Sequence, residues 1–406
     1  QEANEIDDNA NRNEVEKLYR SMKNGNTSFR NLPQKQQCDP LVLQKYFKAH
    51  FNLPNTHPTL ELIDAPDFIK NLQNIDVSNI NMDPPNIEEL ETIVSSLKNG
   101  RSANDIPAMY LKVGMECKEF KDELLNLFKT IWDTSKIPKH WGHTKLVALW
   151  KGPSKGSKHD PTTYRGIQIG STMCKVLVMM IIKRLEEWYE KQLLEQQHGF
   201  RSGRGTIDAI HIIKQVQQIT YNMKKQCYAL FVDLTAAFDH VNRNMMFETI
   251  SKRLPPSSSQ KLFKLLESLY SYTSTALNNL PDEEFEITTG VRQGGPESSF
   301  LFNLFIDFVM RIYLERCKHA GVKFLFLNHR IPASATTSKK TTVGKQTMDW
   351  QGYADDLVLL FDDTKNLQLG LEILNTTFND YHLEINITKT KTMIMNFMKT
   401  EDKVEY

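Results

Sequence analysis

The feature that most constrains the fold is a pair of adjacent aspartates, Asp355 and Asp356, set between two apolar runs in residues 352–361. An apolar strand, a tight acidic turn and a second apolar strand are typical of a β-hairpin, so we expect both carboxylates at its tip. Neighbouring carboxylates repel each other, and a fold that buries them needs a compensating cation. A solvated Asp-Asp turn is the commoner meaning of this dipeptide, but the apolar flanks argue against it. The pair therefore indicates a site for divalent ions, which needs a third carboxylate from elsewhere in the chain.

A candidate for this third carboxylate is Asp233, which closes an apolar run that reads as a buried strand over residues 228–234. If this strand and the hairpin are neighbours in one sheet, the three carboxylates converge. Two divalent ions held there can activate a 3′-hydroxyl and stabilise a leaving pyrophosphate. Oxygen-only ligation and phosphate substrates point to Mg²⁺, with Mn²⁺ as an alternative, rather than to zinc. The pattern predicts nucleotidyl transfer.

Length and composition set the broad class. A chain of 406 residues predicts two or three subdomains, and 40% hydrophobic with 24% charged residues fits an ordinary soluble globular protein. No apolar run approaches the roughly 20 residues of a membrane span, so we expect no membrane partner. The five cysteines are odd in number, widely spaced and never in a Cys-x-x-Cys pair. That excludes a disulfide scaffold or a zinc knuckle and suits a reducing, intracellular compartment. Because the sequence has neither an initiator Met nor a signal peptide, we expect a piece of a longer polypeptide.

Charge is distributed unevenly along the chain. Residues 57–99 are acidic, whereas residues 139–225 carry fifteen Lys and Arg against six Asp and Glu. Aromatic residues interleave with the basic ones, which is typical of a phosphate-binding surface. Glycines stand beside Lys151, Arg165, Arg201 and Arg204, where backbone amides and side-chain cations can both reach an anion. An ordinary charged helix face is a plausible alternative for residues 183–191, but less so for the glycine-rich loops.

Periodicity and capping signals predict the remaining elements. We expect helices over residues 41–47, 87–97, 260–270, 299–313 and 367–381, strands over 145–150 and 392–397, and an amphipathic helix that starts at 235–239. Residues 289–296 read as a mobile glycine loop. Residues 328–347 are polar and rich in Ser, Thr and Lys, and we expect a mobile excursion there.

Four motifs in this order resemble a known family: residues 231–239, 292–296, 353–356 and 389–391 look like the palm of a reverse transcriptase. The upstream segments 96–100, 164–167 and 197–204 are similar to the fingers of the non-LTR (LINE-type) retrotransposon enzymes. The resemblance covers roughly residues 88–397, and four ordered motifs at plausible spacing make it specific.

The resemblance implies an α+β right-hand polymerase fold with basic fingers, a ferredoxin-like palm of antiparallel sheet plus helices, and a helical thumb. On this basis residues 1–87 form a polar, acidic and partly helical N-terminal extension, residues 88–227 the fingers, and residues 228–397 the palm, with an insertion at 328–347. Only nine residues, 398–406, follow the last predicted strand. Because so few residues cannot form a stable isolated helix, we expect there only a tail or the truncated start of a thumb.

The resemblance also implies roles for individual residues. Phe238 matches the residue that stacks under the incoming sugar and excludes a 2′-hydroxyl, although core packing at a helix start would also explain it. Glu297 and Ser299 stand where the family usually has an apolar residue and a proline, which predicts an extra acid beside the template path. The implied set comprises metal ligands (Asp233, Asp355 and Asp356, with Leu234), nucleotide-binding residues (Lys151, Arg165, Ala237, Phe238 and Gln293) and template- or primer-binding residues (Arg201, Arg204, Arg292, Gly294 and Lys389).

The function that the resemblance implies is an RNA-directed, and also DNA-directed, DNA polymerase of a non-LTR retrotransposon. Its partners would be an RNA template, a DNA primer or target DNA, and dNTPs. It would act in the nucleus, within a longer polypeptide that also has thumb and endonuclease regions. The alternative is a domesticated or group II intron maturase-like palm that serves as an RNA-binding scaffold. Arg292 favours the retrotransposon class, because maturases tend to carry Pro there, and the three acids favour an active enzyme.

Overall fold

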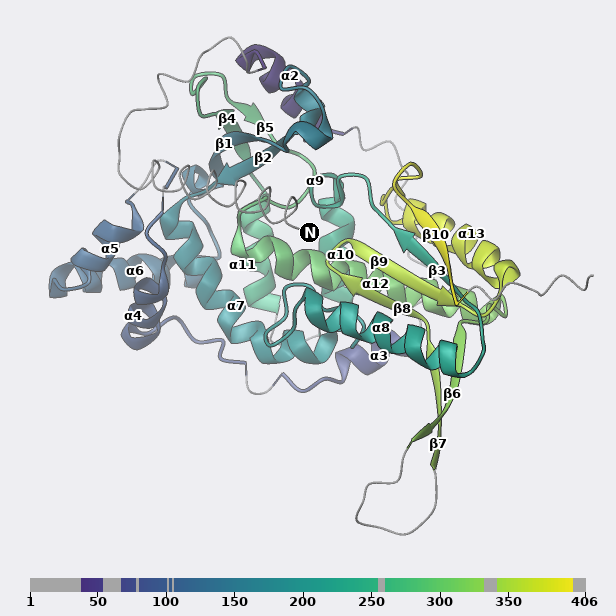
Figure 1. The fold of residues 1–406 in the computed structure, drawn as a ribbon. Coiled ribbons are helices and arrows are strands. Elements are labelled where there is room, and N and C mark those ends of the chain that lie inside the picture. The colour runs from purple at the N-terminus through teal and green to yellow at the C-terminus, as the bar shows by residue number, and fades with distance from the viewer. Residues whose placement is uncertain are drawn as a thin grey trace, which may run out of the picture.

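The computed structural model describes residues 38–53, 67–77, 80–100, 102–103, 106–254, 260–331 and 342–396. Within these residues the chain forms a mixed α+β fold with two four-stranded sheets and one two-stranded ribbon (Figure 1). Residues 1–37 and 397–406 lie outside the described residues. The expectations for the far N-terminus and for a tail or thumb start at 398–406 therefore remain predictions.

The sheet that carries the three aspartates is formed by β3 (Cys227–Val232), β8 (Trp350–Tyr353), β9 (Asp356–Phe361) and β10 (Lys391–Met395). Its strand order is β10-β3-β9-β8, and every neighbouring pair is antiparallel. The predicted hairpin is confirmed, since β8 and β9 pair directly. The predicted neighbourhood of the two acid-bearing strands is also confirmed, since β3 pairs with β9.

This aspartate sheet is covered on both faces, which explains its apolar runs. Alternate side chains such as Leu230 and Leu359 join the main core, which is built on α12 (Pro296–His319). Residues of the opposite parity, such as Ala229 and Leu360, pack in a second cluster with side chains from α8 (Thr206–Asn222). α13 (Thr364–Asp380) also packs on β3 and β9. Burial on both faces specifies the register of the strands, because a one-residue slip would exchange the side chains of the two faces.

The other four-stranded sheet consists of β1 (His143–Trp150), β2 (Tyr164–Ile169), β4 (Ser274–Leu277) and β5 (Phe285–Glu286), in the order β2-β1-β4-β5. We call β1 and β2 the basic hairpin, because Lys151 and Arg165 lie on it. The predicted helix after Pro40 is confirmed as α2 (Pro40–His50). It buries Leu43, Phe47 and the following Phe51 against this sheet.

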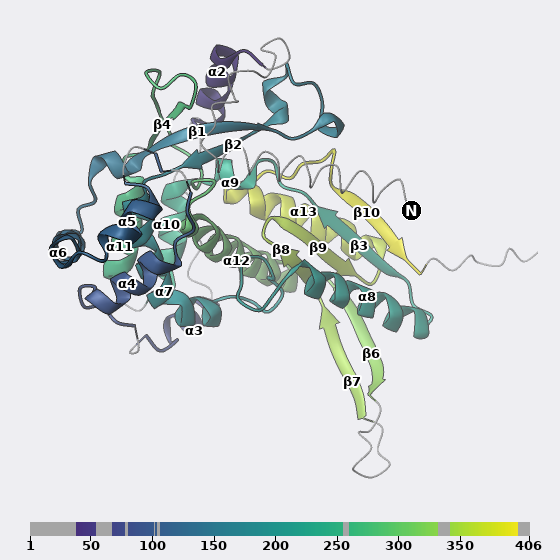
Figure 2. The same ribbon diagram turned by 60° about the vertical axis from the view of Figure 1, so that its left-hand side comes forward.

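Helices fill the space beside and between the sheets (Figure 2). They are α3 (Asp67–Gln73), α4 (Ile87–Ser96), α5 (Ala108–Gly114), α6 (Lys118–Thr134), α7 (Thr172–Gln192), α9 (Ala237–His240), α10 (Arg243–Lys252) and α11 (Gln260–Tyr270). The predicted cap of α4 is confirmed, since the Asn86 side chain accepts a hydrogen bond from the Glu89 backbone at 2.9 Å.

Of the helices within the described ranges, none is both long and apolar enough to cross a membrane. The five cysteines all fall in these ranges, and no disulfide joins any of them.

One prediction of local structure is wrong. The helix expected from residue 235 is a four-residue turn, α9, because Ala236 adopts a left-handed backbone (φ 46°) and the chain leaves the helix again at Val241. The described part of the stretch 328–347, for which only an excursion was expected, belongs to two strands. β6 (Leu325–Ile331) and β7 (Thr342–Met348) pair antiparallel, so main-chain hydrogen bonds order a polar segment that local composition assigns to a loop. This ribbon projects away from the body of the protein in both views (Figures 1 and 2).

A buried carboxylate, Asp307 of α12, joins three parts of the core. It accepts hydrogen bonds from Arg253 at 2.9 Å, from Arg311 at 2.8 Å and from the backbone of Leu194 at 2.7 Å. The side chains of Asp307 and Arg253 are both 0% exposed. Burial lowers the pKa of Arg253, and the charge of Asp307 acts against this shift. The network holds the end of α10 and the chain after α7 against α12.

Removing the charge of Asp307 is therefore expected to destabilise the fold. The Asp307→Asn change leaves the buried Arg253 guanidinium without its counter-charge, which costs about 3–5 kcal/mol in free energy of unfolding. The matched control is Asp380→Asn, which breaks the half-exposed Arg316–Asp380 pair and should cost about 1 kcal/mol or less. Urea denaturation of both variants measures the difference. Equal losses would show that Asp307 does not hold the core together.

Candidate active site

The three aspartates lie at one end of their sheet because of the register between β3 and β9. The last paired residues are Val232 and Leu357, and the same antiparallel register sets Asp233 across from Asp356. Tyr353 and Asp356 close the hairpin, so Asp355 sits in the two-residue turn between them. The structure thus brings together the three carboxylates that the sequence singled out.

The three carboxylates also act on one another electrostatically. Burial raises the pKa of Asp355, and the negative charges of Asp356 and Asp233 raise it further. Burial and the charge of Asp233 also raise the pKa of Asp356. Such shifts mean that the fold holds like charges together at a cost in free energy, which a bound cation would relieve.

A cation from the chain itself already contacts this group. The ammonium of Lys389 donates to Oδ2 of Asp233 at 3.0 Å, and its charge lowers the pKa of Asp356. The hydroxyl of Thr390 accepts from the Asp233 backbone, and the Asn386 N–H donates to the Asp233 carbonyl at 2.8 Å. Lys389, which the sequence places in the template- or primer-binding set, therefore contacts a carboxylate of the site itself.

Two more cations approach from the basic hairpin. Burial lowers the pKa of Lys151, and the positive charges of Arg165 and Lys389 lower it further. The charge of Arg165 also lowers the pKa of Asp355. The basic hairpin therefore lies close to the end of the aspartate sheet. Its Lys151 and Arg165 face the same region as Lys389, next to the three carboxylates. An anion that bridges these cations, such as a triphosphate, would offset their mutual repulsion.

The turn before α9 supplies the next group of side chains. Phe238 stacks on Phe302 with 4.3 Å between ring centroids, and Phe200 lies edge-on to Phe238 at 6.2 Å. Phe238 is only half-buried, so one part of its ring packs in the core and another part remains accessible. The neighbouring Ala237 is buried, and Leu234 is buried and forms a β-bridge with Ile385.

The predicted nucleotide-binding residue Gln293 is held by a residue that sequence reasoning missed. Its amide donates to Oδ1 of Asp239 at 2.7 Å, and Oδ2 of Asp239 contacts the ring of His50 at 3.0 Å. His50 ends α2, almost 190 residues earlier in the chain. Asp239 ends the first motif, 231–239, but the sequence assigned it no role, and no local signal pointed to His50.

Arg292 and Glu297 correct two expectations about the template path. Arg292 is 5% exposed and Glu297 is 1% exposed. Nε of Arg292 donates to Oε1 of Glu297 at 3.0 Å, and the hydroxyl of Tyr270 also faces this carboxylate. Glu297 therefore points into the core, and the guanidinium of Arg292 is engaged there as its counter-charge. The acid that departs from the family pattern thus has its own buried partner.

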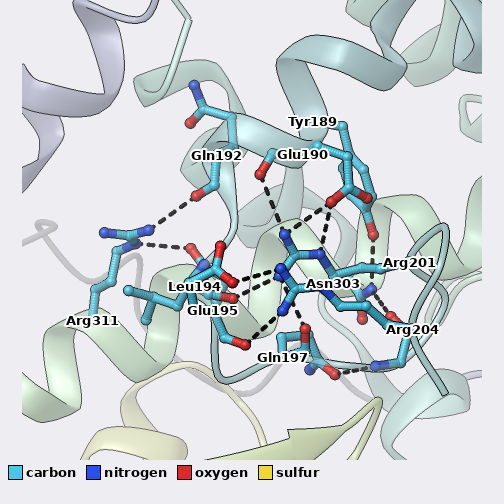
Figure 3. Close-up of polar contacts among 12 residues, drawn as sticks. Tyr189, Glu190, Gln192, Leu194, Glu195, Gln197, Arg201, Arg204, Asn303 and Arg311 are labelled. Carbon is cyan, nitrogen blue, oxygen red and sulfur yellow. Dashed lines mark hydrogen bonds and ion pairs between the residues drawn. The ribbon is translucent and has the colours of Figure 1, made fainter. Parts of the chain in front are cut away.

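Arg201 has a structural role in place of the expected template contact (Figure 3). It is buried, and its guanidinium donates to Glu190 at 2.9 Å and to the carbonyls of Leu194 and Gln197. Arg204 is less buried and pairs with the exposed Glu195 at 2.6 Å, so it lies at the surface. Gly294 is exposed in the glycine loop, where its left-handed φ of 119° and its approach to the Gln168 carbonyl leave no room for a side chain.

The arrangement of acids and bases agrees with the comparison to known proteins. A family model described as "Reverse transcriptase (RNA-dependent DNA polymerase)" matches residues 155–406. The chain belongs to the reverse transcriptase family. The match includes Arg165 of the basic hairpin and the three carboxylates, so the geometry described above is that of a reverse transcriptase domain.

Several proteins of retrotransposable elements are similar to this reverse transcriptase. A 115 kDa protein in the type-1 element R1DM of Drosophila melanogaster is 27% identical over 242 residues, which is 58% of this chain and 22% of that protein. The "Probable RNA-directed DNA polymerase from transposon BS" of the same species is 29% identical over 132 residues, 32% of this chain and 14% of its own length. The Pol polyprotein of the type-2 element R2DM, also from Drosophila melanogaster, is 24% identical over 243 residues. These residues are 59% of this chain and 20% of that polyprotein. The chain thus spans about a fifth of the length of these relatives, or less.

The donor set fits divalent ions chemically. Carboxylate oxygens are the ligands that Mg²⁺ prefers, and the raised pKa values of Asp355 and Asp356 report an excess of negative charge. Among the described residues, no three His, Cys, Asp or Glu side chains lie close enough to form a finished metal site. Lys389, at 3.0 Å from Oδ2 of Asp233, supplies part of the positive charge that a bound ion would otherwise provide.

The position of Phe238 generates a prediction about sugar selection. The Phe238→Ala change removes the accessible ring, so discrimination against rNTP relative to dNTP should fall about tenfold or more. Phe238→Tyr retains the ring and should retain discrimination. The measurement is kcat/KM for both nucleotides on one template. Unchanged selectivity in Phe238→Ala would assign this side chain to core packing only.

The basic hairpin generates a second prediction. Arg165→Ala should raise the KM for dNTP about tenfold or more, since a charge-assisted contact to phosphate is lost, while template affinity changes little. The matched control is Lys158→Ala, on the same hairpin loop, because Lys158 lies 4.7 Å over the Trp150 ring and is already engaged. Steady-state kinetics and template binding separate the two effects. Weaker template binding with an unchanged KM would place Arg165 on the template instead.

Proposed function

We propose that this chain is the polymerase core of a non-LTR retrotransposon reverse transcriptase, which extends a DNA 3′ end on an RNA template and also accepts DNA templates. The observation that carries the proposal is the register that sets Asp233 across from Asp356 beneath the basic hairpin. An acidic side for divalent ions and a basic side for phosphates then face each other, as nucleotidyl transfer requires.

In this proposal Asp233, Asp355 and Asp356 hold two Mg²⁺ ions, with the backbone carbonyl of Leu234 as a further oxygen donor. Mn²⁺ could replace Mg²⁺ on such oxygen ligands. When bound, the two ions activate the primer 3′-hydroxyl and stabilise the leaving pyrophosphate.

The side chains around the ions have separate tasks. Lys151 and Arg165 bind the triphosphate, and their repulsion favours the bound anion. Phe238, above the buried Ala237, excludes a 2′-hydroxyl, and Gln293 is oriented toward the nucleotide by Asp239. Arg204, Gly294 and Lys389 remain the candidates for contact with template or primer, because Arg201 and Arg292 have buried partners.

The finer architecture belongs to the same proposal. The basic hairpin with α4 to α7 corresponds to fingers, and the aspartate sheet with α12 and α13 corresponds to a palm. RNA template, DNA primer or target DNA, and dNTPs are the proposed partners, and the nucleus is the proposed compartment. The names of the relatives support membership of a longer polypeptide, with thumb and endonuclease regions supplied elsewhere.

The competing proposal is an RNA-binding scaffold, domesticated or related to group II intron maturases. A scaffold has no need to keep three carboxylates together at an energetic cost, yet this chain keeps them. The relatives named as RNA-directed DNA polymerases of transposons also favour the active retrotransposon enzyme.

Primer extension on RNA and DNA templates with Mg²⁺ or Mn²⁺ tests the proposed function. Asp355→Asn keeps the size of the side chain but removes a ligand charge, so the extension rate should fall on the order of 10³-fold or more. The matched control is Asp362→Asn, at the other end of β9, where Asp362 pairs with Lys225. This control should extend primers at nearly the wild-type rate.

Two outcomes would contradict the proposed function. Near-normal extension by Asp355→Asn would mean that these carboxylates do not hold the ions. RNA binding by the wild type, with no extension under either metal, would favour the scaffold.

A further inference from the structure

The β8 edge of the aspartate sheet is covered by a segment from a distant part of the sequence, residues 196–201, which we call the edge segment. The N–H of His198 donates to the carbonyl of Gly352 at 2.8 Å, and the N–H of Gly352 donates to the carbonyl of Gln196 at 2.9 Å. Gln197 and Gly352 form a parallel β-bridge. The edge segment thus extends the sheet beyond β8, beside the turn that carries Asp355.

Gln197 uses its whole side-chain amide on this turn. It is 0% exposed. Its Oε1 accepts hydrogen bonds from the N–H groups of Ala354 and Gly199, both at 2.9 Å, and its Nε2 donates to the Ala354 carbonyl at 3.1 Å. The residue immediately before Asp355 is therefore bound through both of its backbone polar groups by one buried side chain.

Ala354 needs such support because of its backbone conformation. Its φ is 58°, in the left-handed region that L-residues disfavour. Strain of this kind persists at a site only where surrounding structure determines it. Gly199 permits the close approach, because a Cβ at residue 199 would collide with the backbone nitrogen of Ala354.

The edge segment is itself anchored in the core, so it can act as a rigid support (Figure 3). Asn303 of α12 donates to the Gly199 carbonyl at 2.7 Å. Arg201 donates to the Gln197 carbonyl at 3.0 Å and to Glu190 of α7. The contacts connect the Asp355 turn to the two longest helices of the described residues.

We infer that Gln197 is a positioning residue for the carboxylate of Asp355. By binding both polar groups of Ala354, its amide sets the orientation of the peptide that leads into Asp355, and so the direction of that carboxylate toward a divalent ion. This inference rests on the proposed metal-dependent function and adds to it a residue that does not touch metal, nucleotide or template. Residues that orient metal ligands in this way typically change metal affinity or activity 10- to 100-fold when replaced.

The first test replaces Gln197 with Met, which has similar length and no amide. Mn²⁺ is the probe, and its binding to the chain is measured from the free-ion signal in electron paramagnetic resonance. We expect Gln197→Met to bind Mn²⁺ about tenfold or more weakly and to lower kcat by a similar factor. The KM for dNTP and the template Kd should stay within about twofold, because the basic hairpin is untouched.

A second variant keeps the test valid if Gln197→Met does not fold. Gln197→Glu retains the accepting oxygen but loses the donated hydrogen bond to the Ala354 carbonyl. It also places a carboxylate at a fully buried position, so Mn²⁺ binding should again be weaker than in the wild type. The matched control is Gln196→Met, whose side chain bonds Asp349 rather than the turn and whose replacement should leave Mn²⁺ binding unchanged.

The outcomes separate this inference from the proposed function. Wild-type Mn²⁺ affinity and kcat in a folded Gln197→Met or Gln197→Glu variant would overturn the role of Gln197, while the wild type still extends primers. The proposed function, and the inference with it, would be overturned if the wild type did not extend primers and the Asp355→Asn variant bound Mn²⁺ as tightly as the wild type. Equal losses in Gln196→Met and Gln197→Met would also overturn it, because the effect would belong to the edge segment as a whole.

Discussion

The antiparallel pairing of β3 with β9 is the interaction on which the rest of the structure depends. It sets Asp233 across from Asp356, although the two residues are more than a hundred positions apart in the sequence. The register is secured by burial on both faces, since Leu230 and Ala229 enter different apolar clusters. A slip by one residue would exchange these faces and separate the carboxylates at the same time. Core packing and site geometry are therefore specified by a single register.

Burial decides which of the many cations can serve the site. Arg253, Arg292 and Arg201 each bind a carboxylate inside the protein and hold core elements together. Lys151, Arg165 and Lys389 instead share one space with the aspartates, where their charges act on each other. Lys and Arg side chains thus have two kinds of role in this protein. Those that pair with an acid inside the protein stabilise the fold, and the others remain available to the site.

The Asp355 turn shows how a strained local structure depends on distant parts of the chain. Ala354 has an unfavourable backbone conformation, and Gln197 and Gly199 supply the contacts that stabilise it. Gln293 is held in a comparable way by Asp239, which in turn contacts His50. Both devices connect the site to segments that precede the aspartate sheet in the sequence.

The sequence by itself determined the elements whose signal is local. The β8–β9 hairpin, the capped helix α4 and the acids that end apolar strands could all be predicted, because period-two alternation, capping and turn chemistry act over a few residues. The α9 turn and the β6–β7 ribbon could not, since a left-handed Ala236 and pairing between strands override local composition.

Only the tertiary structure decided which site candidates face the same space. Arg201 and Arg292 form ion pairs inside the protein, and Glu297 faces the core. Gln197 contacts Ala354, and His50 contacts Asp239, each across more than a hundred residues of sequence. The physical reason is that burial and ion pairing depend on which side chains meet across the fold, and a single sequence does not encode those meetings in any local pattern.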